Sequence, residues 1–154
     1  MTLPGRFWKW RMQGGALELA AQARAQLAAD APPDAILATD MLNVPAWLGL
    51  LRDCLPAAVP LLLYMHENQL TYPPPAGDRS VFQLGMINIT TALAADKVLF
   101  NSHTHKTAFL KAIPEFLKRG QDFIPTGIAE KIRRKSRVLY PGISFPPVSA
   151  ADAQ

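Results

Sequence analysis

Four short apolar runs recur along the chain, and each ends in polar or turn-forming residues. They cover residues 35–39, 61–65, 98–100 and 137–140. The run at 61–65 shows no alternation with polar residues, which is typical of a strand buried on both faces in a parallel sheet. We therefore predict four strands, with the strand at 61–65 in the centre.

The stretches around these runs favour helices. Strong helix formers follow the pair Gly14-Gly15, Asn43 and Ser80 are suitable helix caps, and Asn101-Ser102 precedes another helical stretch. The predicted helices cover residues 16–29, 44–54, 80–95, 103–119 and 128–135. Strands that alternate with helices predict an α/β fold, namely a Rossmann-like open, mostly parallel sheet with helices on both faces.

Polar residues at the strand ends carry the candidate chemistry. The four strands end in Asp40, His66, Asn101-Ser102 and Pro141-Gly142. Ligands bind at the carboxyl ends of strands in open α/β sheets, so we expect these four ends to line one cleft. The prolines at 73–75 cannot continue a strand and should stiffen the loop that follows His66.

The segment after the central strand holds the first candidate site, formed by His66, Glu67, Asn68 and Gln69. An imidazole supplies acid–base chemistry near neutral pH, and His66 comes first after the strand, so we favour it as the catalytic residue. Glu67 need not face the same cleft, because adjacent residues of an extended segment point opposite ways. The alternative is a loop whose polar side chains only bind its own backbone.

Asn101 and Ser102 offer a hydroxyl and free backbone N–H groups at a helix start, which suits a sugar hydroxyl or a phosphate. An ordinary helix cap is the alternative, and we favour it from the residues alone. His103 and His105 with His66 form only a weak zinc pattern, since no cysteine lies nearby. We expect no metal and no cofactor.

Two basic segments are candidates for contact with nucleic acid. The first basic segment, residues 6–11, interleaves cations with aromatic rings, which suits RNA or a stacked base unless both tryptophans pack on the core. The second basic segment, residues 131–137, suits phosphate contact or is a solvated face. The candidate nucleic-acid-binding residues are Arg6, Trp8, Lys9, Trp10, Arg11, Arg133, Arg134 and Lys135.

Composition narrows the class of protein. The chain has 154 residues, of which 49% are hydrophobic and 18% charged, so one folded domain is expected. The net charge of +4 permits an anionic partner such as RNA or a nucleotide. A single cysteine, Cys54, excludes an internal disulfide and suits the reducing cytoplasm. No apolar run approaches the roughly 20 residues of a membrane span, so we expect no membrane partner.

Residues 64–73, Tyr-Met-His-Glu-Asn-Gln-Leu-Thr-Tyr-Pro, resemble the hallmark segment of the tRNA-queuosine mannosyltransferase family, a glycosyltransferase-4-like group. Three further segments resemble that family in the same order: Leu3-Pro4 with Trp8-Lys9-Trp10-Arg11, residues 95–102 and residues 138–143. The resemblance spans roughly residues 3–147.

The resemblance implies the N-terminal, acceptor-side domain of a two-domain GT-B enzyme. Such enzymes transfer a sugar with retention, here mannose from GDP-mannose to the cyclopentenediol of queuosine in tRNA. His66 occupies the place of the active-site histidine. We expect Glu67, Asn68, Gln69, Asn101 and Ser102 to bind substrate.

The same resemblance sets expectations for domain organisation. We expect the acceptor-side domain at residues 1–147 and a disordered tail at 148–154. The family's first strand and its donor-binding domain are expected to be missing from this chain, the donor domain being lost or supplied in trans. Transfer by this chain alone is then not expected. The alternative is a non-catalytic RNA-binding remnant.

Overall fold

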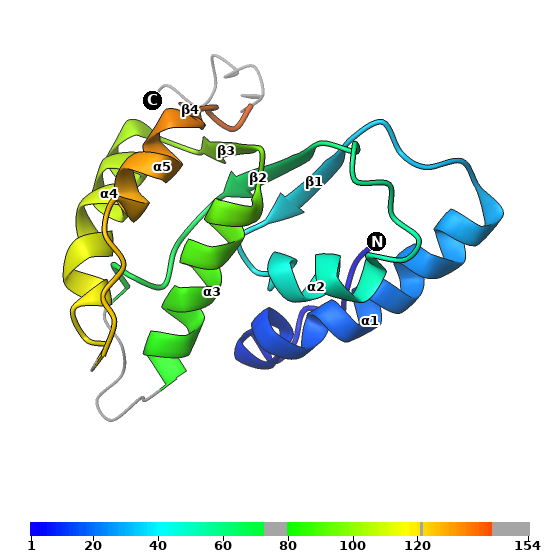
Figure 1. The fold of residues 1–154 in the computed structure, drawn as a ribbon, viewed down its shortest axis with the longest axis horizontal. Coiled ribbons are helices and arrows are strands. Elements are labelled where there is room, and N and C mark those ends of the chain that lie inside the picture. Colours follow the sequence, from blue (N-terminus) through cyan, green and yellow to red (C-terminus); the bar gives the residue numbers. More distant parts are fainter. Residues whose placement is uncertain (73–79, 121, 143–154) are drawn as a thin grey trace, which may run out of the picture.

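Four parallel strands form one sheet in the residues that the structure, a computed structural model, describes: 1–72, 80–120 and 122–142 (Figure 1). The strands are β1 (Ile36–Thr39), β2 (Leu61–Met65), β3 (Lys97–Phe100) and β4 (Ser136–Val138), in the spatial order β1-β2-β3-β4. The predicted Rossmann-like parallel sheet is therefore confirmed. The last strand begins and ends earlier than the predicted 137–140, although the backbone N–H of Leu139 still donates to Phe100.

Five helices connect or precede these strands within the described ranges. They are α1 (Trp8–Ala29), α2 (Val44–Leu51), α3 (Ser80–Ala94), α4 (His103–Leu117) and α5 (Ile128–Arg134). Asn43 caps α2, since its side-chain oxygen accepts a hydrogen bond from the Ala46 N–H at 3.2 Å. The proline loop at 73–75 and the tail at 148–154 lie outside the described residues, as does the side chain of Ser80.

The first helix begins at Trp8 rather than at residue 16, so the predicted start was wrong. Gly14 and Gly15 lie inside the helix because neighbouring side chains fill the space of their missing Cβ atoms. A Cβ at Gly14 would come within 2.7 Å of the Trp10 indole, and one at Gly15 within 2.9 Å of a Leu3 methyl carbon. Close packing, and not a break in the helix, explains the glycine pair.

The described helices pack on one face of the sheet, which differs from the predicted cover on both faces (Figure 1). On the covered face, Leu63, Val98 and Phe100 are buried against residues of α2, α3, α4 and α5. On the opposite face, Leu37 of β1 is 69% exposed. The strand order explains this arrangement, because consecutive strands that step in one direction with right-handed crossovers place every helix on the same face.

Candidate functional site

Three strand ends meet through hydrogen bonds at the carboxyl edge of the sheet. His66, after β2, donates its backbone N–H to the Asp40 carboxylate, after β1, at 2.9 Å. Asn101, after β3, donates its side-chain amide to the His66 carbonyl at 2.8 Å and its backbone N–H to Met65 at 3.2 Å. The carboxyl edge therefore brings Asp40, His66 and Asn101 together, as the parallel topology predicts.

The end of β4 is joined to this edge through an aromatic residue. The Tyr64 hydroxyl donates to the Leu139 carbonyl at 2.9 Å, and the Tyr64 ring meets the His66 ring edge-on at 4.7 Å. Tyr140, which follows Leu139, lies beside the ring of His103 at a centroid distance of 6.3 Å. Two histidines and two tyrosines therefore lie at this end of the sheet.

The buried carboxylate of Asp40 contacts the imidazole of His66. The Asp40 side chain is 1% exposed, whereas that of His66 is 58% exposed, and Asp40 Oδ1 lies 3.3 Å from His66 Nδ1. An acceptor at Nδ1 favours the tautomer with its proton on that nitrogen, which leaves Nε2 as an exposed acceptor. Sequence reasoning placed Asp40 at the cleft but did not pair it with His66.

The polar residues after His66 mainly organise their own loop. Asn68 is buried, and its side-chain oxygen accepts hydrogen bonds from the backbone N–H groups of Leu70 and Thr71, each at 3.0 Å. Gln69 is buried as well and donates its side-chain amide to Glu67 at 3.3 Å. The backbone-binding alternative therefore describes Asn68, and substrate contact by Glu67, Asn68 and Gln69 stays a prediction.

Asn101 and Ser102 occupy the start of α4. The Ser102 hydroxyl accepts the backbone N–H of His105 at 3.1 Å, which is an ordinary helix cap. The Asn101 side-chain oxygen accepts from the Ser102 hydroxyl at 3.3 Å and lies 3.0 Å from His105 Nδ1. These contacts orient the Asn101 amide toward His66, so both residues position the site whether or not they touch substrate.

Burial disfavours the charged form of His105. Burial lowers its pKa below the usual 6.5, and the negative charge of Asp40 only partly opposes that effect. Its Nδ1–H donates to Asn101, while its Nε2 is buried without a hydrogen-bond partner in the described part of the chain. Among the residues described, no group of histidine, cysteine and acidic side chains could hold a metal ion.

We expect His105 to make folding sensitive to mild acid. Because its pKa is lower in the folded than in the unfolded chain, the unfolded chain binds more protons below about pH 6.5, and stability falls as pH falls through that range. His105→Gln still supplies a side-chain N–H donor, now from an amide, but removes the titrating ring. Urea unfolding from about pH 5 to about pH 8 should show a steeper acid loss for the wild type than for His105→Gln. Parallel profiles for the two proteins would contradict this assignment.

Residues 1–143 match the family model described as tRNA-queuosine alpha-mannosyltransferase N-terminal. The chain belongs to this family. It is also 35% identical over 144 residues to the tRNA-queuosine alpha-mannosyltransferase of Drosophila melanogaster, a match that covers 94% of this chain. The chain spans only 37% of the length of that mannosyltransferase.

The first basic segment of this mannosyltransferase-family chain lies at the same edge as His66. It begins α1, and the Met12 carbonyl in the next turn accepts the N–H of Asn43, in the turn after β1, at 3.1 Å. Trp10 is 67% exposed and Trp8 is exposed too, so neither is packed in the core. The Lys9 ammonium lies 5.7 Å from the centre of the Trp8 ring. The segment therefore presents cations and aromatic rings to solvent.

The second basic segment lies at the opposite, amino edge of the sheet. Arg133 and Arg134 are exposed at the end of α5, and both pair with Glu130, at 3.3 and 3.2 Å. Lys135 turns inward and donates to the carbonyls of Leu93 and Ala95, just before β3, and burial lowers its pKa. The structure does not bring this segment to the candidate site, and Lys135 already has two backbone acceptors. Contact between these residues and nucleic acid stays a prediction.

No helix in the described ranges is long and apolar enough to cross a membrane.

Proposed function

We propose that this chain is the acceptor-side domain of a retaining GT-B glycosyltransferase that transfers mannose from GDP-mannose to queuosine in tRNA. Membership of the mannosyltransferase family supports the reaction class. The observation that carries the proposal is the exposed imidazole of His66 held on the buried carboxylate of Asp40. A cytoplasmic location is part of the proposal and agrees with the lone Cys54.

The Asp40–His66 pair suits the handling of a sugar or acceptor hydroxyl. With its Nδ1 proton directed to Asp40, His66 presents Nε2 outward as a hydrogen-bond acceptor. An acceptor hydroxyl of the cyclopentenediol bonded to Nε2 is oriented for attack on the anomeric carbon of the donor. In the reaction a new carbon–oxygen bond forms to that carbon, and the bond to the diphosphate oxygen breaks. The acceptor proton passes along its hydrogen bond to Nε2 of His66, and the diphosphate departs as an anion.

Donor binding is assigned in this proposal to a second domain, covalently linked or supplied separately. The length of the Drosophila relative supports this, since the chain covers 37% of it. A GT-B site lies between two domains, and transfer needs both substrates held in near-attack geometry. This chain then supplies one wall of the cleft, with His66 on it.

Transfer should therefore depend on both halves. The 154-residue chain is incubated with queuosine-containing tRNA and GDP-mannose, alone and together with the remaining, donor-side part of the Drosophila enzyme. Nucleoside mass spectrometry should detect one added hexose on queuosine only in the combined reaction, with GDP-mannose preferred over UDP-glucose. Transfer by the chain alone would contradict the assignment of the donor site, and no transfer in any mixture would contradict the proposed reaction.

The exposed aromatic and basic surface of residues 6–11 favours a second candidate, tRNA binding without catalysis. The same assay separates the two. Binding of tRNA by the chain, with no hexose transfer in the combined reaction, would favour the binding function.

A further inference from the structure

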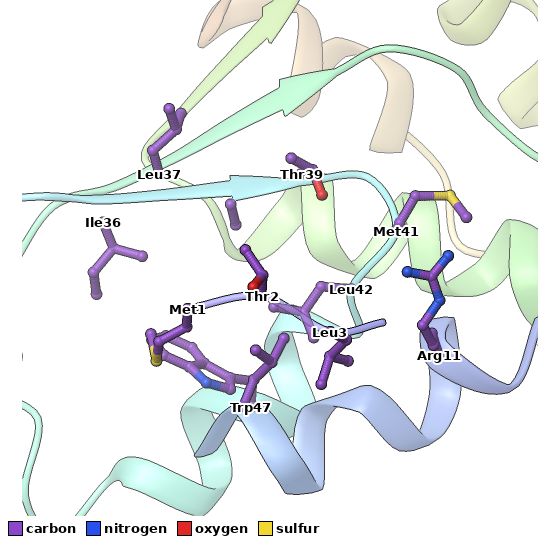
Figure 2. A pocket seen from close by; sticks show the side chains of 12 residues that line it. Met1, Thr2, Leu3, Arg11, Ile36, Leu37, Thr39, Met41, Leu42 and Trp47 are labelled. Carbon is purple, nitrogen blue, oxygen red and sulfur yellow. The ribbon is translucent and has the colours of Figure 1, made fainter. Parts of the chain in front are cut away.

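A cavity of about 390 Å³ lies between the outer edge of β1 and helices α1 and α2 (Figure 2). Its walls are mostly apolar and include Leu37, Leu42 and Trp47. The polar side chains among the lining residues of this cavity are the guanidinium of Arg11 and the hydroxyls of Thr2 and Thr39. An apolar cavity with a few polar groups in it is the usual form of a small-ligand site.

Arg11, which lines this cavity, has a buried N–H donor without a hydrogen-bond acceptor in the described part of the chain. The side chain is half-buried, and its Nε–H is shielded from solvent without an acceptor in the described ranges. The indole N–H of Trp47, in the wall of the same cavity, also lacks an acceptor there. Most buried N–H groups in proteins are hydrogen-bonded, so the guanidinium of Arg11, a cation that lines the cavity, is left with an unpaired donor.

Three other arginines of the described chain have carboxylate partners, unlike Arg11. Arg24 pairs with Asp53, and Arg133 and Arg134 both pair with Glu130. In Figure 2 the terminal nitrogens of Arg11 point toward the turn that contains Met41. The Arg11 side chain is therefore half-buried, with its Nε shielded from solvent and its terminal nitrogens beside this turn.

The polar end of the cavity adjoins the candidate catalytic pair. Thr39 and Met41 line the cavity together with Arg11, and they flank Asp40 in the sequence. The carboxylate of Asp40 bonds to His66. One turn, residues 39–41, therefore has the guanidinium of Arg11 beside it and carries the carboxylate that holds the His66 imidazole.

We propose that Arg11 forms a phosphate-binding site in this cavity, in addition to the site at His66. A guanidinium offers paired N–H donors that match two oxygens of one phosphate, and weak hydration suits it to a partly apolar setting. The choice of phosphate as the ligand rests on the proposed function, because GDP-mannose and tRNA both carry phosphate groups. A nucleoside diphosphate and an RNA backbone phosphate share this chemistry, and the experiment distinguishes these two sources of phosphate.

Binding is measured on the 154-residue chain by calorimetry at low salt, with two probes used separately. One probe is GDP, and the other is an RNA hairpin with the length of an anticodon stem and loop. Arg11→Met removes the charge but keeps an unbranched apolar side chain. It should weaken binding of at least one probe by about tenfold or more, the range of a charge-assisted pair of hydrogen bonds. Loss confined to GDP identifies a nucleotide site, and loss confined to the hairpin identifies a backbone contact.

Arg52→Met is the matched control, because Arg52 is an exposed cation that does not line the cavity and lies outside both basic segments. It should change either affinity by less than about twofold. Equal losses in both variants would mean diffuse attraction to a basic surface and would overturn the proposal. Unchanged binding by Arg11→Met, or no binding of either probe by the wild type, would overturn it as well.

If Arg11→Met does not fold, Arg11→Lys replaces it, since lysine keeps the charge but loses the paired N–H geometry. Binding of the affected probe should then fall by a few-fold, and full retention would exclude a bidentate site. The proposal can fail independently of the proposed function. If mannose is transferred and the Arg11 variants bind phosphate normally, the proposed function stands and the Arg11 site does not exist. If Arg11 binds phosphate but no mannose is transferred, the site stands and the proposed function is wrong.

Discussion

His66→Ala should lower mannose transfer by about 10²-fold or more in the combined two-part reaction, the scale expected for a positioned acid–base group. The alanine removes the only imidazole that rests on the Asp40 carboxylate through its ring nitrogen in the described part of the chain. Stability should change little, because the imidazole is largely exposed and the backbone N–H of His66 keeps its bond to Asp40. The loss should therefore appear in turnover and not in the melting temperature.

His103→Ala is the control for this prediction. His103 is exposed at the start of α4, near the same edge of the sheet, and its ring contacts Tyr140 rather than Asp40. Turnover of this variant should stay within about threefold of the wild type, as for a surface substitution away from the reacting atoms. If His66→Ala and His103→Ala transfer mannose equally well, the catalytic assignment of His66 is wrong.

The position of the candidate site was largely predictable because it follows from parallel topology. The central strand was recognisable from its apolar residues, and right-handed connections bring consecutive strand ends to one edge. That argument is sufficient to place Asp40, His66 and Asn101 together. It does not give the register, and register is what puts Thr39 opposite Tyr64 and thereby brings Asp40 to the backbone and ring of His66.

The errors arose where distant packing overrides local pattern. Gly14 and Gly15 are poor helix formers, yet α1 passes through them because Trp10 and Leu3 occupy the adjacent space. The direction of the Lys135 side chain was not predicted either, because the end of α5 directs its ammonium onto carbonyls near β3, and its contact with nucleic acid stays a prediction. The cover of the sheet depends on strand order, which no local segment encodes.

Asn88 connects two turns of the candidate site to helix α3. It is 1% exposed, its side-chain oxygen accepts the Gln69 N–H at 2.7 Å, and its amide donates to the Asp40 carbonyl at 3.0 Å. The residue therefore satisfies one buried backbone group after β2 and another after β1. Because His66 lies between these turns, the same contacts hold the Asp40–His66 pair in place.

Asn88→Ala should lower the free energy of unfolding by about 2–4 kcal/mol, since it leaves two buried backbone groups without partners. Thr90→Ala on the same helix is the control, because within the described residues the Thr90 hydroxyl bonds to carbonyls of α3 itself, those of Met86 and Ile87. It should cost less than about 1 kcal/mol. Urea unfolding measures both, and amide hydrogen exchange at Gln69 should accelerate in Asn88→Ala alone. Equal unfolding midpoints and unchanged exchange would show that water replaces the Asn88 side chain without loss, and that α3 does not position the site.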